Sequence, residues 1–118
     1  MDQQMARTFA ERWIALWNAR DLEGVLALFA DHVVFSSPTA ARLIHGSDGV
    51  VRGKEALRAY WADALSRNPE LHFDLIGVYA GIKTLVINFR HQTGVHANEV
   101  LIFDGPLIVE GHATHFTA

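Results

Sequence analysis

The sequence has 118 residues, of which half are hydrophobic, and a formal net charge of −3 at pH 7. This length predicts one domain, residues 1–118, with a hydrophobic core of useful size. The charge gives no electrostatic reason to expect DNA or RNA binding, and no apolar run approaches the roughly 20 residues of a membrane-spanning helix. The absence of cysteine excludes disulfides and thiolate chemistry. The N-terminus lacks the pattern of a secretory signal, so we expect a cytoplasmic protein.

Three segments of the N-terminal half predict helices. In the first, over about 3–19, apolar side chains recur at helical spacing: Met5, Phe9, Trp13, Leu16 and Trp17. Asp21 fits the N-cap of a second, shorter helix. The third helix is expected over about 54–66, with a stripe formed by Leu57, Tyr60, Trp61, Ala64 and Leu65.

Strands are predicted for most of the remaining chain. The stretch "HVVFSSP" indicates a strand over about 32–37 that ends at Pro38. An antiparallel meander is expected from four further strands at about 71–80, 83–92, 97–104 and 107–117. Residues 38–52 show no sustained period and predict a long loop, a kind of segment that is often functional. The fold class is therefore α+β, with three helices packed on one face of a curved, mostly antiparallel sheet.

The alternation of side chains along a strand separates two faces of the sheet. In the strand over 83–92, the better core face holds Leu85, Ile87, Phe89 and His91. One face of the last strand holds Val109, Gly111, Ala113 and His115. If that face points inward, its two small residues leave space rather than fill it. A concave face of this kind, covered by helices with large aromatic side chains, predicts a largely apolar cavity for a small molecule.

Glu99 is the most informative polar residue. On the strand over 97–104 it shares a face with Leu101 and Phe103, so it lies either at the end of a core or inside a cavity. Burial would raise the pKa of its carboxyl group, and the group could then donate a hydrogen bond or act as an acid or base. The alternative interpretation is a structural acid paired with His91, His115 or Arg90.

His91 and His115 fall on the predicted inward faces, and histidine suits acid–base chemistry near neutral pH. A contact with Glu99 could hold one imidazole tautomer as a base. Alternatively, each is a hydrogen-bonded histidine of the core or of the cavity rim. The spacing of the histidines argues against a metal site: there is no H-E-x-x-H motif, and His112 and His115 lie on opposite faces of one strand. We expect neither a metal nor a cofactor.

Further residues are candidates for contact with a ligand. They are Trp13, Trp17, Ser37, Tyr60, Trp61, Phe89 and Phe103. Aromatic residues at helical spacing more often belong to the core. No G-x-S-x-G elbow surrounds Ser37, so it is expected to bind a ligand or to cap the strand end rather than to act as a nucleophile.

Three stretches resemble the SnoaL-like branch of the nuclear-transport-factor-2-like superfamily, which also includes the ketosteroid isomerases. They are "RWIALWNARDLEGVLALFADHVVFSSP", "GVVRGKEALRAYWADAL" and "NEVLIFDG". The resemblance implies a cone-shaped roll in which a strongly curved sheet wraps a pocket, and it implies dimers that form through the outer face of the sheet. On that face we expect Asn88, Arg90, Val100 and Ile102.

The resemblance also shows where this chain departs from the isomerases. Ser37 occupies the position of their general base, and Trp13 occupies the position of a tyrosine that binds the oxyanion. Glu99 retains the position of their oxyanion aspartate. Steroid isomerisation by that mechanism is therefore not expected.

Three hypotheses follow from the sequence. The first is a cofactor-independent enzyme of isomerase, cyclase or hydrolase type that acts on an apolar, carbonyl-containing molecule, with Glu99 and a histidine in acid–base roles. The second is a non-catalytic binding domain with the same pocket. The third is a dimeric accessory protein whose pocket is vestigial.

Overall fold

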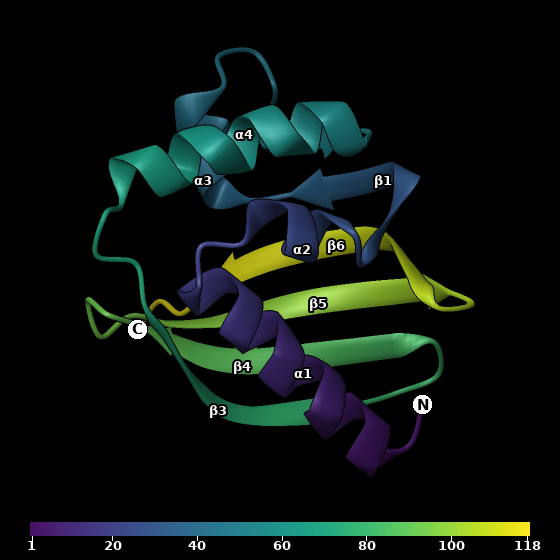
Figure 1. Ribbon diagram of the computed structural model, residues 1–118. Helices are drawn as coiled ribbons and strands as arrows, with labels where there is room; N and C mark the ends of the chain where they lie inside the picture. The colour runs from purple at the N-terminus through teal and green to yellow at the C-terminus, as the bar shows by residue number, and fades with distance from the viewer.

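A six-stranded sheet forms the frame of the protein, and helices cover its concave face (Figure 1). The computed structural model describes residues 1–118. The helices are α1 (Gln3–Asn18), α2 (Leu22–Leu26), α3 (Pro38–Leu43) and α4 (Lys54–Arg67). The strands are β1 (Phe29–Ser36), β2 (Val50–Arg52), β3 (Phe73–Ala80), β4 (Thr84–His91), β5 (His96–Asp104) and β6 (Leu107–His115). No helix is both long enough and apolar enough to cross a membrane.

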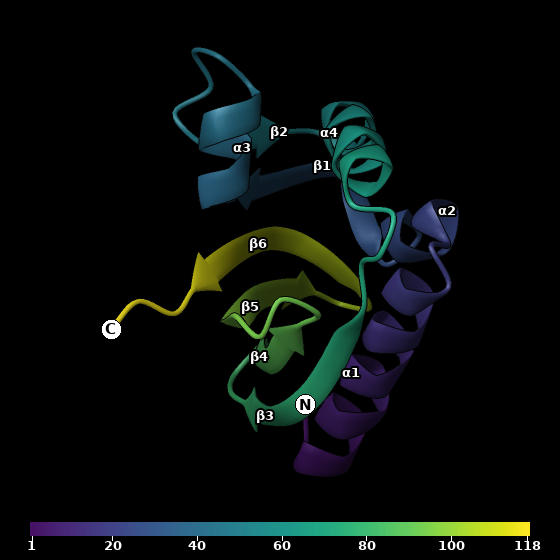
Figure 2. The ribbon, with the colours of Figure 1, turned by 90° about the vertical axis from the view of Figure 1, so that its left-hand side faces the viewer.

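The sheet has the strand order β2-β1-β6-β5-β4-β3. Strands β3 to β6 form the expected antiparallel meander, and β1 joins it by parallel pairing with β6. The sheet curves strongly, and in Figure 2 β6 arches over β5 and β4 while β1 and α4 lie beyond it. This confirms the predicted α+β roll.

The prediction of a long loop over 38–52 is wrong, because this segment contains α3 and β2. The side chain of Ser37 caps α3 by accepting a hydrogen bond of 3.1 Å from the backbone N–H of Thr39, and Pro38 occupies the first turn, where proline is favourable. A six-residue helix has fewer than two turns, so it shows no period in the sequence.

The last strand contains a bulge that the alternation pattern does not reveal. Ile102 pairs with Glu110, but Phe103 pairs with Ile108, so the register shifts by one residue. Ile108 is therefore fully buried, and the prediction that Val109 rather than Ile108 points inward is wrong. Beyond the bulge, Gly111 lies on the inner face as expected. It leaves no empty space, because a Cβ atom there would lie 3.1 Å from the ring of Phe35.

The helix α1 lies across the sheet, with its buried face formed by Ala6, Ala10, Trp13, Ile14 and Trp17. Met5, which we expected in this stripe, is 58% exposed. At the end of the helix, Asn18 makes two hydrogen bonds with the backbone of Phe73: its Nδ2 donates to the carbonyl oxygen at 3.0 Å and its Oδ1 accepts from the N–H at 2.8 Å. These bonds fix the C-terminus of α1 at the start of β3.

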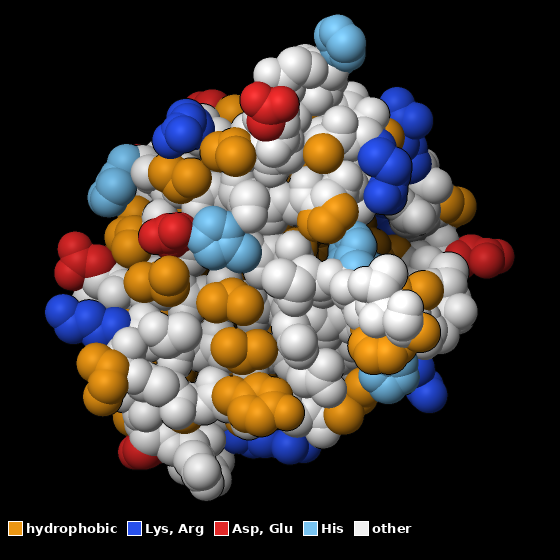
Figure 3. All heavy atoms as spheres, turned by 180° about the vertical axis from the view of Figure 1, so that it is seen from behind, with side chains coloured by type: hydrophobic (Ala, Val, Ile, Leu, Met, Phe, Trp, Pro, Cys, Tyr) orange, Lys and Arg blue, Asp and Glu red, His pale blue; other side chains and the backbone are white.

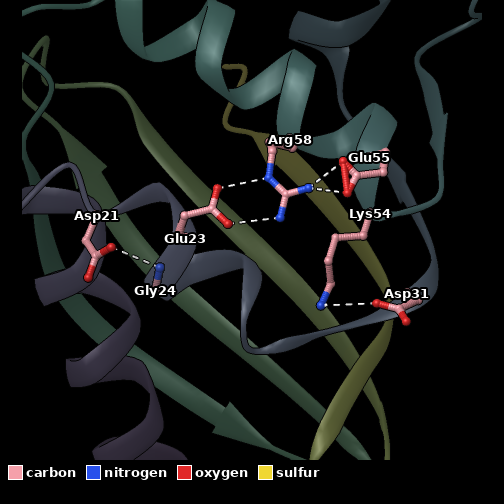
Figure 4. A network of polar contacts seen from close by, with 7 residues as sticks. All are labelled: Asp21, Glu23, Gly24, Asp31, Lys54, Glu55 and Arg58. Carbon is pink, nitrogen blue, oxygen red and sulfur yellow. Dashed lines mark hydrogen bonds and ion pairs between the residues drawn. The ribbon is translucent and has the colours of Figure 1, made fainter.

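A polar network on the surface joins α2 to α4 (Figure 4). The guanidinium group of Arg58 donates two hydrogen bonds of 2.9 Å to the carboxylate of Glu23, and it also contacts Glu55. Lys54 lies 3.5 Å from Asp31. Exposed ion pairs contribute little to stability singly, but the bidentate pair of Arg58 and Glu23 is a specific contact between α4 and α2.

Candidate functional site

A cavity of about 230 Å³ lies between the concave face of the sheet and helices α1, α3 and α4. Much of its wall is aromatic, from Trp13, Trp17, Trp61, Phe35, Phe73 and Phe89. All three tryptophans of the sequence line the cavity. An apolar cavity with a few polar groups is the usual form of a small-molecule site, and the prediction of such a cavity is consistent with this geometry.

Glu99 points into this cavity from β5. The residue is only 5% exposed, and its carboxyl group makes no hydrogen bond or ion pair with the protein. Its neighbours in the ladder are Ile87 on β4 and Ala113 on β6, neither of which offers a polar side chain. Burial therefore raises the pKa of Glu99 to about 8, and the carboxyl group is mostly protonated at pH 7.

None of the three residues in the alternative interpretation (His91, His115 and Arg90) pairs with Glu99. Arg90 lies on the other face of the sheet and contacts Asp74 at 3.3 Å. The side chains of His91 and His115 line the cavity but form no hydrogen bond with Glu99. The interpretation of Glu99 as a structural, paired acid is therefore wrong.

His91 and His115 form a pair on adjacent parts of the cavity wall. Their ring centroids are 6.0 Å apart and their planes are nearly perpendicular. Burial and the neighbouring His115 lower the pKa of His91, and burial and the charge of Arg42 lower the pKa of His115. Both rings are therefore neutral at pH 7 and able to accept a proton. Neither ring makes a hydrogen bond within the protein. The histidines therefore differ from the alternative interpretation, in which each is hydrogen-bonded in the core or at the cavity rim.

Ser37 lines the cavity but is already engaged. Its hydroxyl oxygen caps α3 and also accepts a hydrogen bond of 3.2 Å from the hydroxyl group of Tyr60. Burial raises the pKa of Tyr60, so that residue remains protonated at pH 7. Ser37 and Tyr60 thus form a neutral polar edge of the cavity, held in place by α3.

Trp13 and Trp17 each contribute an unused hydrogen-bond donor. Their indole Nε1 atoms are buried and have no acceptor. A buried donor without a partner costs roughly 1–3 kcal/mol, so such donors are uncommon in native proteins. The i, i+4 spacing on α1 places both rings on one side of the helix, where Trp13 stacks on Phe73 and Trp17 contacts Trp61 edge-on.

Phe89 and Trp61 line the cavity as expected, but Phe103 does not. Phe103 shares a face with Glu99, yet it lies four residues along β5, about 13 Å away at the usual rise of a strand. There it packs edge-on against Phe9 of α1, with ring centroids 5.2 Å apart. Phe103 therefore belongs to the hydrophobic core, and its assignment to the ligand site is wrong.

Several lining residues were missed in the sequence. Thr39 and Arg42 belong to α3, which we had interpreted as loop, and Gln92 follows β4. The pair Ser37-Pro38 is a common start signal for a helix and could have revealed α3. No group of three or more His, Asp or Glu side chains is arranged to hold a metal ion.

A second, more open depression of about 400 Å³ lies where β5 begins and β6 ends, and it shares Ala97 and His115 with the inner cavity. Its central polar groups satisfy one another: Asn88 Nδ2 donates to Asn98 Oδ1 at 2.8 Å, and Thr114 Oγ1 donates to the carbonyl oxygen of Asn98 at 3.0 Å. It offers no unpaired buried group, so the inner cavity is the better candidate for chemistry.

Three linked side chains on the outer face of the sheet have the composition of a hydrolytic triad. Ser36 Oγ lies 2.5 Å from His112 Nδ1, and His112 Nε2 lies 2.7 Å from Glu110 Oε1. These residues line neither the inner cavity nor the second depression. Because both described cavities lie elsewhere, we interpret these three side chains as a structural link between β1 and β6.

The profile of the SnoaL-like domain matches residues 10–113. The chain belongs to this family. A SnoaL-like protein of unknown function from Burkholderia thailandensis is 36% identical, with a TM-score of 0.92 and 98% of each chain covered. The predicted family is thereby confirmed.

Two solved structures of lower sequence identity show the fold alone. An NTF2-like protein of unknown function from Cytophaga hutchinsonii has a TM-score of 0.70 at 12% identity, with 94% of this chain and 89% of the other covered. A protein from Kribbella flavida, provisionally assigned as a ketosteroid isomerase, has a TM-score of 0.69 at 18% identity, with 99% and 82% covered. No curated protein matches the sequence.

Proposed function

We propose that the cavity binds a small apolar molecule with a carbonyl group, and that Glu99 and a histidine catalyse proton transfer on it without a cofactor. The observation that supports this is the state of Glu99. Only two polar residues of the chain are buried, Ser37 and Glu99. The hydroxyl group of Ser37 forms hydrogen bonds within the protein, whereas the carboxyl group of Glu99 forms none. Unpaired buried acids are costly and concentrate at functional sites.

The two kinds of titratable group have the protonation states that acid–base catalysis needs at pH 7. Burial keeps Glu99 protonated, so it can donate a hydrogen bond to a carbonyl oxygen. His91 or His115, both neutral, can remove a proton from the carbon beside that carbonyl. The proton then returns from the imidazolium to the same or another carbon, which restores the histidine and completes the transfer.

The family supports a small-molecule site without specifying a reaction. The structural relative from Kribbella flavida is provisionally assigned as a ketosteroid isomerase, but the sequence resemblance puts Ser37 and Trp13 at the positions of two residues that such enzymes use. Ser37 caps α3, so it offers no base. For this reason we assign the base to a histidine and propose no steroid substrate.

Deuterium exchange tests this proposal without knowledge of the product. A set of small ketones (cyclohexanone, acetophenone, 2-tetralone) is incubated with protein in D₂O at neutral pH, and loss of the α-protons is followed by NMR. We expect exchange above the buffer rate, reduced about 100-fold or more in Glu99→Leu and in the double variant His91→Gln/His115→Gln. The exposed His32 provides the control, His32→Gln, which should retain the wild-type rate.

The two remaining hypotheses are outcomes of the same experiment. Ketones that quench the tryptophan fluorescence but exchange only at the buffer rate would indicate a non-catalytic binding domain. Failure of every ketone to bind would contradict the proposal and favour an accessory protein.

We also propose a homodimer that forms through the outer face of the sheet. Figure 3 shows apolar side chains in rows over this face. On β4 and β5, Val86, Val100 and Ile102 alternate with buried residues and are themselves only half-buried. An apolar sheet face of this kind suits an isologous contact better than bare solvent.

A further inference from the structure

The charges around the cavity are asymmetric. Its ionisable lining groups are Arg42, Tyr60, His91, Glu99 and His115. The last four are neutral at pH 7, because burial acts on each of them in the direction of the uncharged form. Arg42 is therefore the single formal charge that faces a ligand, and it is positive.

Arg42 has no carboxylate partner. Arg58, Arg67 and Arg90 all form ion pairs with acidic side chains, whereas the guanidinium group of Arg42 makes one long hydrogen bond, of 3.4 Å, to Thr39 Oγ1. Arg42 is exposed and yet lines the cavity, so it lies at the opening. Its helix α3 contacts the end of β6 (Figure 2), which brings its charge close enough to lower the pKa of His115.

The wall of the cavity also holds hydrogen-bond donors without partners. Trp13 and Trp17 hold buried N–H groups without partners, and the protonated carboxyl group of Glu99 is a third donor. A ligand that satisfies these groups carries oxygen acceptors. An ammonium ligand would find aromatic faces, but it would also face Arg42 and would leave the indole donors unpaired.

We propose that the ligand of this cavity carries, besides its carbonyl group and an apolar body that lies against the tryptophans, a carboxylate or similar acidic group that pairs with Arg42. This inference rests on the proposed function, since it names the class of molecule that the same cavity binds. An arginine fork matches the two oxygens of a carboxylate. The rest of the ligand replaces water against the aromatic wall.

Matched probes that differ only in charge test the inference. The first series is 3-phenylpropanoate, 3-phenylpropanamide and 3-phenylpropylammonium, and the second is octanoate, octanamide and octylammonium. Binding is measured by the change in tryptophan fluorescence, because all three tryptophans line the cavity. Each series is run on the wild type, on Arg42→Gln and on the control Arg52→Gln. Arg52 is an exposed arginine that also lacks an ion pair, and it lies outside the cavity.

In wild type and in Arg52→Gln, we expect each carboxylate to bind about five-fold more tightly than its amide, as for a charge-assisted contact at a partly exposed site. Arg42→Gln should abolish this preference and leave amide affinity unchanged. Amides or ammonium ions that bind as tightly as the carboxylates, or a preference that survives in Arg42→Gln, would overturn the inference while sparing the proposed function. If no member of either series binds, the small-molecule function itself is contradicted and the inference falls with it.

Discussion

Glu99 lies directly opposite Ala113 in the ladder between β5 and β6. The methyl group of Ala113 is too small to cover the carboxyl group beside it, and both residues line the cavity. A larger residue at this position of β6 would occupy the space next to the acid. The pairing of a small residue with a buried acid therefore keeps the acid accessible to a ligand.

Filling this space should block the site. We expect Ala113→Leu to abolish the fluorescence response to the wild type's best probe, because the added side chain enters the cavity. Overpacking costs about 1–3 kcal/mol, so the variant should still fold if that cost remains within the stability of the protein. The matched control is Ala56→Leu on the exposed side of α4, which should bind as the wild type does. Unchanged binding by Ala113→Leu would contradict the location of the site.

The raised pKa of Glu99 makes stability depend on pH. In the folded protein its pKa is about 8, against 4.5 for the ordinary carboxyl group, so between these values the folded state holds a proton that the unfolded state has released. The free energy of unfolding therefore falls as pH rises through this window, by up to about 1.4 kcal/mol per pH unit. The contribution of Glu99 to this slope should vanish in Glu99→Gln.

Urea unfolding between about pH 7 and 8 is the measurement of choice for this effect. In that range His91 and His115, whose folded pKa values are lowered, are mostly neutral in both states. Below it they act in the opposite sense, because the unfolded chain then binds more protons than the folded one. Equal slopes for the wild type and Glu99→Gln would show that Glu99 is ionised in the folded protein.

Ser37 joins two elements of the cavity wall, so its loss should affect both. Ser37→Ala removes the cap of α3 and leaves the hydroxyl group of Tyr60 without an acceptor, at an expected cost of about 1–3 kcal/mol. Tyr60→Phe removes the unpaired hydroxyl group. In a double-mutant cycle, we expect the combined variant to be less destabilised than the sum of the single variants. Strict additivity would contradict the Tyr60–Ser37 hydrogen bond.

The proposed dimer predicts a mass by light scattering of 26.2 kDa, twice the 13.1 kDa of one chain. Val100→Glu places a charge at the centre of the outer face, where Val100 lies between Val86 and His112, and should give monomers at micromolar concentration. Ala59→Glu on the exposed surface of α4 is the control and should remain dimeric. A monomeric wild type at this concentration would argue against the interface.

The sequence predicts the faces of strands better than positions along them. The two-residue period placed Glu99, Phe89 and His115 on the inner face, because alternation is a local property of the backbone. The same period could not show that Phe103 lies beyond the cavity, since the extent of a cavity depends on which helix covers each part of the sheet. The bulge beside Val109 was invisible for a related reason: it arises from pairing between strands.

Short elements were the other limit. The α3 helix has six residues, too few for a hydrophobic period, and its existence depends on a cap and on contacts with distant parts of the chain. Arg42 was missed as a consequence. The third predicted helix, by contrast, has four turns with an apolar stripe, and the structure buries Leu57, Tyr60, Trp61 and Leu65 as that stripe indicates.

The parallel pairing of β1 with β6 joins an early strand to the last one. During synthesis, β1 emerges long before its partner, so its hydrogen-bonding edge must wait for β6. The contacts that close the cavity therefore have large sequence separation, a feature associated with slow folding. Until β6 arrives, both β1 and β5 present open edges to other chains, so the nascent protein is most vulnerable to aggregation just before β6 is made.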